Sequence, residues 1–198
     1  MRAALSAGLL WLGLAGAACG ASDWLSTAWR IEEGLPDNTV TCLEQTRDGY
    51  LWVGTLNGLA RFDGVRFVSL GAHNRPEILN NRISALCEAT GGALWIGTDG
   101  GGVARLKDGT LRSFTCWEGL PDERVTALYT GASGQMIVHT PGGACRWDGD
   151  RMRPCPDPPP APPAPAFTVP AASPVTCLLE DREGNRWAGT AGGGLIRL

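Results

Sequence analysis

The residues of this chain that could do chemistry are polar side chains lying between short apolar segments. A carboxylate, amide and guanidinium cluster at the mouth of a set of loops is typical of a site that hydrogen-bonds a small polar ligand. The alternative is turn chemistry, because Asp and Asn also stabilise loops by bonding the local backbone; for any single residue we favour this alternative. The ligand-binding candidates are Asp37, Asn38, Asn57, Arg82, Asp99, Asp122 and Arg124.

Catalysis has little support in the sequence. It contains no G-x-S-x-G, no HExxH, no phosphate loop and no CxxC, and His73 and His139 stand alone. The glycine run at 100–102 is predicted to be a turn between strands and not a phosphate cradle at the start of a helix. A carboxylate pair on the loops could in principle act as acid and base, but nothing fixes its spacing. We therefore predict no catalytic residue, no metal site and no cofactor.

A recurring five-residue segment organises the elements that must position these loops. Leu51–Thr55 (LWVGT) returns as Leu94–Thr98 (LWIGT) and Arg186–Thr190 (RWAGT), and Met136–Thr140 (MIVHT) holds the same slot in altered form. The tryptophan slot recurs at intervals of 43, 42 and 50 residues. A period in the low forties is typical of propellers and related repeat architectures.

Each repeat is predicted to be a meander of four short antiparallel strands joined by glycine-rich turns. In the first repeat these strands are Val40–Glu44, Leu51–Thr55, Leu59–Phe62 and Arg66–Ser69. The repeats start near residues 38, 81, 123 and 173, and the fourth stops after its third strand.

The beginning of the chain supplies the strand that the fourth repeat lacks. Gly34–Asp37 (GLPD) is repeated as Gly119–Asp122, so Trp29 corresponds to Phe114 in the fourth strand of a repeat. Residues 27–31 are therefore predicted to be a lone fourth strand. In a circular array of blades, such a strand completes the last blade.

The propeller arrangement predicts where the candidate residues meet. Loops that join one repeat to the next lie on the same face as those joining the second and third strands. These loops are 33–38, 74–82 and 118–124, together with 56–57, 99–100 and 191–192. They hold all seven candidates, so the binding site is expected on this face.

The tryptophans Trp52, Trp95 and Trp187 are predicted to pack between blades and not to form a ligand platform, because they recur at one slot within strands. The glycine two residues after each tryptophan is expected to let a neighbouring backbone come close. The third repeat carries Ile137 and His139 in these two slots. Its blade is therefore predicted to make the loosest contact.

The remaining segments predict an exported protein that does not bind nucleic acid. Residues 1–21 resemble a signal peptide, with Arg2 before an apolar run that is short for a membrane span. Cys19 offers a less favoured alternative, a lipoprotein anchor.

The other six cysteines are interpreted as core residues that the sequence cannot pair. Residues 154–174 hold ten of the fourteen prolines and are predicted to be a solvated loop insertion. The net charge is −3 and the basic residues are scattered, which argues against nucleic-acid binding.

The segment Val40–Gly64 (VTCLEQTRDGYLWVGTLNGLARFDG) closely resembles the two-component regulator propeller repeat, with its L-W-[IV]-G-T and G-L-x-R-[FYW]-D-G elements. The W-x-x-E-x-G-L-P stretch at Trp29–Pro36 is similar to the start of such proteins. The resemblance implies a periplasmic sensor region for a small-molecule or oligosaccharide ligand, fused in its family to a membrane helix and an output domain. This sequence departs from the family in having four repeats where seven per ring is typical, and in lacking a membrane helix and an output segment.

The expected fold is all-β: a β-propeller of four-stranded antiparallel blades, with an open arc favoured over a closed four-blade ring. We expect a fragment of a sensor, whose exposed blade edges could pair with another molecule. The alternatives are a propeller-scaffold enzyme, lyase or glycan-active, and a purely structural protein-interaction propeller.

Overall fold

The computed structural model describes residues 27–198 apart from 164, 166 and 170, and these residues form four antiparallel sheets of four strands each. The expected signal peptide and Cys19 lie outside the described residues. Two short 3-10 helices, η1 (Ile31–Glu33) and η2 (Cys116–Glu118), precede the first and third sheets. Within the described part of the chain, no helix is long and apolar enough to cross a membrane.

Each sheet is one blade. Blade 1 contains β2 (Val40–Gln45), β3 (Leu51–Thr55), β4 (Gly58–Phe62) and β5 (Phe67–Leu70). Blade 2 contains β6 (Ile83–Glu88), β7 (Leu94–Thr98), β8 (Val103–Lys107) and β9 (Thr110–Phe114). Blade 3 contains β10 (Ala127–Thr130), β11 (Met136–Thr140), β12 (Gly143–Trp147) and β13 (Met152–Pro154). Blade 4 contains β14 (Val175–Glu180), β15 (Arg186–Thr190), β16 (Leu195–Arg197) and β1 (Thr27–Trp29).

The N-terminal strand completes blade 4. β1 pairs with β16 in antiparallel register, with Trp29 opposite Leu195. The ring of Trp29 lies 5.5 Å from that of Trp187 and 5.2 Å from that of Phe62 in blade 1. The first strand of the chain thus adds an aromatic side chain to the contact between blades 4 and 1.

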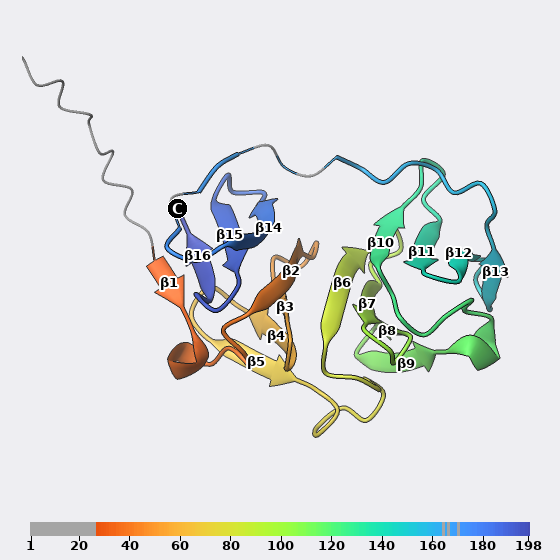
Figure 1. Ribbon diagram of the computed structural model, residues 1–198, viewed down its shortest axis with the longest axis horizontal. Coiled ribbons are helices and arrows are strands. Elements are labelled where there is room, and N and C mark those ends of the chain that lie inside the picture. The colour runs from red at the N-terminus through yellow and green to blue at the C-terminus, as the bar shows by residue number, and fades with distance from the viewer. Residues whose placement is uncertain (1–26, 164, 166, 170) are drawn as a thin grey trace, which may run out of the picture.

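The blades form an open arc in the order 4, 1, 2, 3. Their first strands are neighbours along the inner side, β14 beside β2, β2 beside β6 and β6 beside β10. Figure 1 shows blades 4 and 3 at the two ends of the row, with the segment between β13 and β14 running across from one to the other. The predicted all-β partial propeller is therefore confirmed.

A glycine and a β-branched residue meet at every blade-to-blade contact. A Cβ built on Gly97 would lie 2.5 Å from Cγ1 of Val125 in the next blade. Gly54 likewise faces Ile83, and Gly189 faces Val40. The glycine was expected to admit a backbone. It admits a side chain instead, because a β-branched residue at or just before the first strand of the next blade points into the space. Val175 holds this slot in blade 4, at the end of the arc, and is 40% exposed.

Blade 3 was predicted to make the loosest contact because Ile137 replaces the tryptophan there, and this reason is wrong. Each tryptophan packs against the following blade, so Trp95 of blade 2 serves the contact between blades 2 and 3. There it meets Phe114 at 5.7 Å and Trp147 at 5.4 Å, within one buried cluster that includes Met136 and Val138. Ile137 lies opposite Tyr129 in the sheet, on the face that alternates with that of Met136 and Val138.

The proline-rich segment contacts both ends of the arc. The hydroxyl of Tyr129 donates to the carbonyl of Pro159 at 2.5 Å and lies 2.9 Å from Nε2 of His139. At blade 4, the guanidinium of Arg186 lies 5.2 Å from the ring centre of Phe167. Pro154, expected in the loop, is the last residue of β13, where an edge strand tolerates a residue without an N–H. The segment thus crosses the open side of the arc attached to both end blades.

We predict that Tyr129→Phe loosens this segment. Loss of one hydroxyl donor should weaken its attachment by roughly 0.5–1.5 kcal/mol, because the carbonyl of Pro159 then loses its partner. Cys155, half-buried at the start of the segment, should react with iodoacetamide about 2–10 times faster, a rate that peptide mass spectrometry measures. The exposed Cys116 is the internal control. Tyr50→Phe is the matched variant, because the hydroxyl of Tyr50 makes no hydrogen bond among the described residues. An unchanged rate at Cys155 would mean that this bond does not hold the segment.

Candidate functional site

Three of the seven candidate side chains come together on the loop face. Asp99 lies between two arginines: its Oδ2 is 3.4 Å from Nε of Arg82 and its Oδ1 is 3.3 Å from Nε of Arg124. The side chains are 59%, 65% and 39% exposed for Arg82, Arg124 and Asp99 respectively. We call these three residues the loop-face cluster.

The backbone fixes the centre of this cluster. Asp99 directly follows β7, and its N–H donates to the carbonyl of Arg82 at 2.9 Å. Asp99 also forms a β-bridge with Arg124, and the side-chain amide of Asn80 donates to its carbonyl at 2.9 Å. The loop before blade 2, the end of β7 and the loop before blade 3 are thereby held side by side.

The loop-face cluster carries a net positive charge available to a ligand. It has two guanidinium groups for one carboxylate, and each guanidinium uses only Nε in its ion pair. Exposed ion pairs of this kind stabilise a fold by only about 0.2–1 kcal/mol. Arginine binds carboxylates and phosphates through parallel N–H bonds, so the free nitrogens suit a ligand that presents acidic or hydroxyl oxygens.

The other four candidates do not join the cluster through side-chain contacts. The carboxylate of Asp37 accepts from the N–H of Thr39 at 2.6 Å, and that of Asp122 accepts from the N–H of Arg124 at 2.8 Å. The amide oxygen of Asn38 accepts from the N–H of Ile31 at 2.9 Å. The side chains of Asp37 and Asp122 therefore stabilise local turns, and that of Asn38 ties its loop to η1 seven residues earlier. Asn57 is exposed, and its side chain makes no hydrogen bond within the described residues.

Asn80 is a site residue that the sequence analysis missed. Its Oδ1 accepts from the N–H of Arg82 at 2.9 Å, as Asp37 and Asp122 do from residues two further on. The signal was present in the spacing, because all three lie three residues before a β-branched residue at or just before the first strand of a blade. Here the amide does more than its two counterparts, since its Nδ2 also supports the backbone of Asp99.

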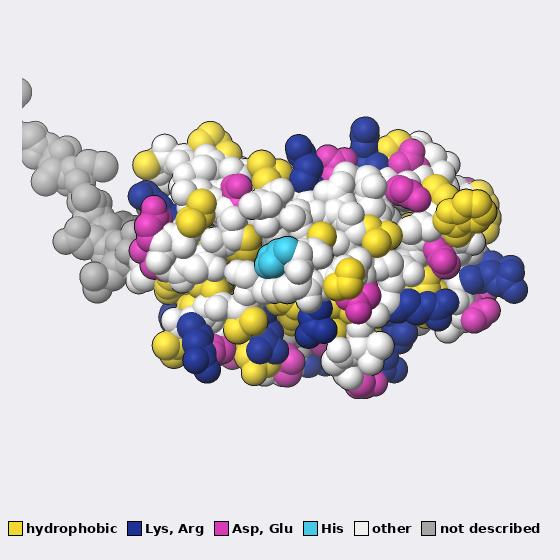
Figure 2. Space-filling view, turned by 90° about the horizontal axis from the view of Figure 1, so that it is seen from below, with side chains coloured by type: hydrophobic (Ala, Val, Ile, Leu, Met, Phe, Trp, Pro, Cys, Tyr) yellow, Lys and Arg dark blue, Asp and Glu magenta, His cyan; other side chains and the backbone are white. Residues whose placement is uncertain are grey.

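The face of the molecule seen from below carries no single sign of charge. In the view from below, Lys and Arg side chains lie among Asp and Glu side chains, with hydrophobic groups scattered between them (Figure 2). Recognition by this face must therefore depend on local clusters of charge and not on a broad electrostatic field.

Two segments of the chain match a known repeat family. Residues 34–57 and 77–100 match the family model described as two component regulator propeller. Each match runs from the loop before a blade to two residues past the end of its second strand, and together they include five of the seven candidates. No curated protein gives a significant match over the chain.

Solved structures share the fold at low identity. The extracellular domain described as that of hybrid two component system BT3049 from B. thetaiotaomicron is 18% identical, with a TM-score of 0.52 over 83% of this chain and 27% of that one. The corresponding domain of BT4673 from the same organism is 21% identical, with a TM-score of 0.54 over 86% and 23%.

An enzyme shares the fold as well. A catalytically inactive virginiamycin B lyase from Staphylococcus aureus, solved with quinupristin, is 12% identical, with a TM-score of 0.51 over 87% of this chain and 59% of the lyase. This chain spans about a quarter of the length of the two extracellular domains, and at these identities the likeness concerns the fold alone. Two of the four repeats of this chain thus match the two component regulator propeller family.

Proposed function

We propose that this chain is an exported, ligand-sensing propeller module of a bacterial two-component-type signalling protein. The observation that carries the proposal is the match of two blades to the two component regulator propeller. The likeness in fold to extracellular domains of hybrid two component systems supports the same class. Export rests on the signal-peptide pattern of residues 1–21.

In this proposal the loop-face cluster receives the ligand and the module binds it without converting it. Because the chain corresponds to about a quarter of those extracellular domains, the ligand signal would pass to parts of a longer sensor. The two guanidinium groups favour a small molecule or oligosaccharide that carries an acidic group. Asp99 would hold both arginines in place and accept a hydrogen bond from a hydroxyl group of the same ligand.

A binding screen with a double variant tests the proposal. A panel of neutral and uronate-containing oligosaccharides would be screened by thermal shift, and hits measured by isothermal titration calorimetry. We expect an acidic ligand to bind, and Arg82→Ala/Arg124→Ala to weaken it at least tenfold, since a charge-assisted hydrogen bond is worth about 1.5–3 kcal/mol. The folded state should be little affected because both side chains are largely exposed.

Arg66→Ala is the matched control. Arg66 also forms an exposed ion pair, with Asp63 at 3.4 Å, but in a turn between the third and fourth strands at the other end of blade 1. Its loss should leave binding unchanged. Ligand binding that survives the double variant would move the site elsewhere, and the absence of any binder in the panel would contradict the sensing role.

A further inference from the structure

The buried tryptophans differ in what accepts their indole N–H. Nε1 of Trp187 donates to Oδ2 of Asp181 at 2.7 Å, and Nε1 of Trp52 donates to Oγ1 of Thr46 at 3.0 Å. Both acceptors lie six residues before their tryptophan. In blade 2 that position is Ala89, and Trp95, only 1% exposed, has no acceptor for its N–H among the described residues.

The backbone places Ala89 where its counterparts lie. In blade 4, the N–H of Asp181 donates to the carbonyl of Asn185 at 2.9 Å, and in blade 2 the N–H of Ala89 donates to the carbonyl of Ala93 at 2.8 Å. A glycine N–H closes each turn, from Gly184 to Asp181 at 3.0 Å and from Gly92 to Ala89 at 2.8 Å. The turns match, so only the side chains differ.

Blade 4 shows which groups are missing from blade 2. There the carboxylate of Asp181 also accepts from Nδ2 of Asn185 at 2.8 Å, and Oδ1 of Asn185 accepts from Nη2 of Arg197 at 2.6 Å. Arg197 lies 5.6 Å from the ring centre of Trp187. Burial raises the pKa of Asp181, but hydrogen bonds from Trp187, Asn185 and the turn amides outweigh it and hold the pKa below its ordinary value. The carboxylate is therefore ionised at neutral pH.

In blade 2 the donors remain and the acceptors are gone. Arg105 holds the slot of Arg197 and lies 5.8 Å from the ring centre of Trp95. Ala89 and Ala93 replace the carboxylate and the amide. The guanidinium of Arg105 makes no ion pair or hydrogen bond with the described residues, so an indole N–H and a guanidinium are left without an acceptor.

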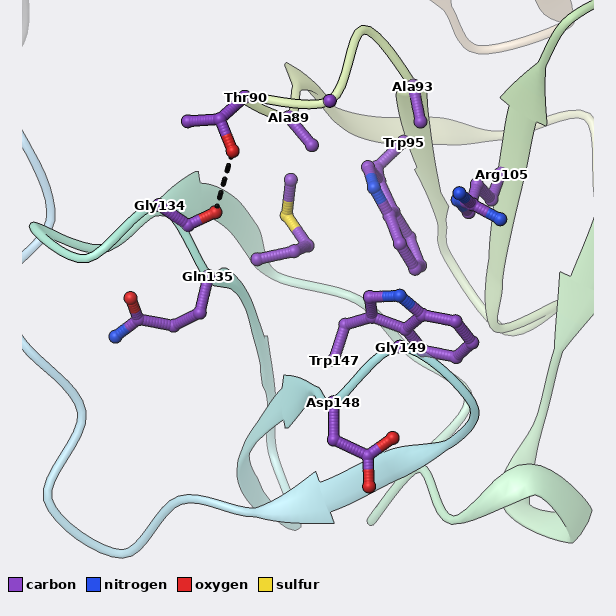
Figure 3. Close-up of a pocket in the computed structure, with 12 residues that line it drawn as sticks. Ala89, Thr90, Ala93, Trp95, Arg105, Gly134, Gln135, Trp147, Asp148 and Gly149 are labelled. Atoms are coloured by element: carbon purple, nitrogen blue, oxygen red, sulfur yellow. Dashed lines mark hydrogen bonds between the residues drawn. The ribbon is translucent and has the colours of Figure 1, made fainter.

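A cavity occupies the vacated space. It has a volume of about 290 Å³ and is lined by Ala89, Trp95, Arg105, Gln135 and Trp147, among others. Figure 3 shows the indoles of Trp95 and Trp147 side by side, with Ala89 and Thr90 above and Gln135 across the space. Arg105 is also 5.7 Å from the ring centre of Trp147.

The one carboxylate at the rim is already engaged. Asp148 pairs with Nε of Arg153 at 2.6 Å and accepts from the N–H groups of Asp150 and Arg151 at 2.9 Å. It therefore leaves the donors of the cavity free. An indole N–H and a guanidinium that have no acceptor among the described residues are available to a molecule that brings one into the cavity.

We propose that this cavity between blades 2 and 3 binds a small organic acid, whose carboxylate takes the place that the Asp181 side chain holds in blade 4. The carboxylate accepts from Nε1–H of Trp95 and is balanced by the charge of Arg105. The flat body of the acid packs against Trp147. The site lies near the start of β7, whereas Asp99 follows the end of that strand. It is independent of the proposed function of the loop face.

Thermal unfolding with benzoate as the probe tests this site. At constant ionic strength, benzoate at a concentration on the order of 100-fold above its Kd should raise Tm by about 5 °C. Benzamide has the same shape without the charge and should raise it far less. Equal shifts from both would overturn the assignment to acids, and no shift from benzoate would overturn the site.

Ala89→Thr and Ala89→Asp provide the internal competitors. Each introduces the acceptor that blade 1 or blade 4 already has, so each should raise Tm without ligand and abolish the benzoate shift. Two variants are used because either side chain alone could disturb the turn. A benzoate shift that persists in a folded Ala89 variant would place the acid elsewhere.

Asp181→Ala is the positive control. It leaves the Trp187 N–H without its acceptor, so Tm should fall, and acetate should restore part of the loss by occupying the vacated position. Rescue of this variant by acetate, with no effect of benzoate on the unaltered chain, would contradict the proposal for blade 2.

Discussion

Trp95→Ala is expected to lower the free energy of unfolding by about 3–5 kcal/mol, the range typical of a large buried aromatic replaced by alanine. Trp95 is 1% exposed and lies in the cluster that joins blades 2 and 3. Its ring stacks near Phe114 and meets the edge of Trp147. Because the space beside it is already a cavity, the neighbours have little means of closing the larger void. Urea unfolding followed by circular dichroism measures the loss.

Trp117→Ala is the control for this change. Trp117 follows the first residue of η2 and is 95% exposed, so its loss should change stability by no more than about 0.5 kcal/mol. Small, equal effects from both substitutions would show that the contact between blades 2 and 3 does not depend on the tryptophan. A large loss confined to Trp95 would support its role in blade packing.

The strands could be predicted from the sequence because each repeat alternates short apolar segments that favour strands with glycine-rich turns. The W-x-G-T segment indicates the second strand, and β3, β7 and β15 each begin one residue before its tryptophan and end at its threonine. Complementary halves at the two ends of the repeat array predicted the pairing of β1 with β16. The two 3-10 helices were missed because three residues of helix leave no periodic pattern.

The direction of blade packing could not be obtained from one repeat. Alternation within a strand says that Trp95 and Ile96 face opposite sides, but not which side carries the next blade. For this reason Ile137 was assigned to the contact between blades 2 and 3, which Trp95 makes instead. The predicted loop face contained the right region, yet side-chain reach decided that Arg82, Asp99 and Arg124 meet while Asp37 and Asp122 turn to their own backbone.

One feature of the cavity beside Trp95 could have been predicted from the sequence, namely the missing acceptor. Aligning the residue six before each tryptophan gives Thr46, Ala89 and Asp181, and the missing acceptor is visible there. Its consequence was not, because an alanine at a turn is unremarkable until the indole N–H of Trp187 is seen to depend on the equivalent carboxylate. Comparison among repeats of one chain thus supplied a reference that composition and motif could not.

Gly97→Ala is expected to destabilise the chain by about 1–3 kcal/mol, the cost of overpacking a filled core. The new Cβ would lie 2.5 Å from Cγ1 of Val125 and 3.4 Å from Cδ1 of Leu128, so blade 3 must shift away from blade 2. Elsewhere in a strand, alanine is favoured over glycine because it restricts the unfolded chain, so the loss would come from the neighbour. Gly91→Ala is the control, since a Cβ there meets nothing within 4 Å.

A double-mutant cycle with Val125→Ala tests whether this contact is the cause. Val125→Ala alone should cost about 2 kcal/mol for the buried methyl groups it removes. In the double variant the shortened side chain makes room for the new Cβ, so the combined loss should be smaller than the sum by roughly 0.5–3 kcal/mol, as found for residues in direct contact. Additive losses in urea unfolding would mean that Gly97 is required for another reason. A favourable coupling would show that glycine and the β-branched residue specify how one blade seats on the next, which explains why Gly54 and Gly189 recur opposite Ile83 and Val40.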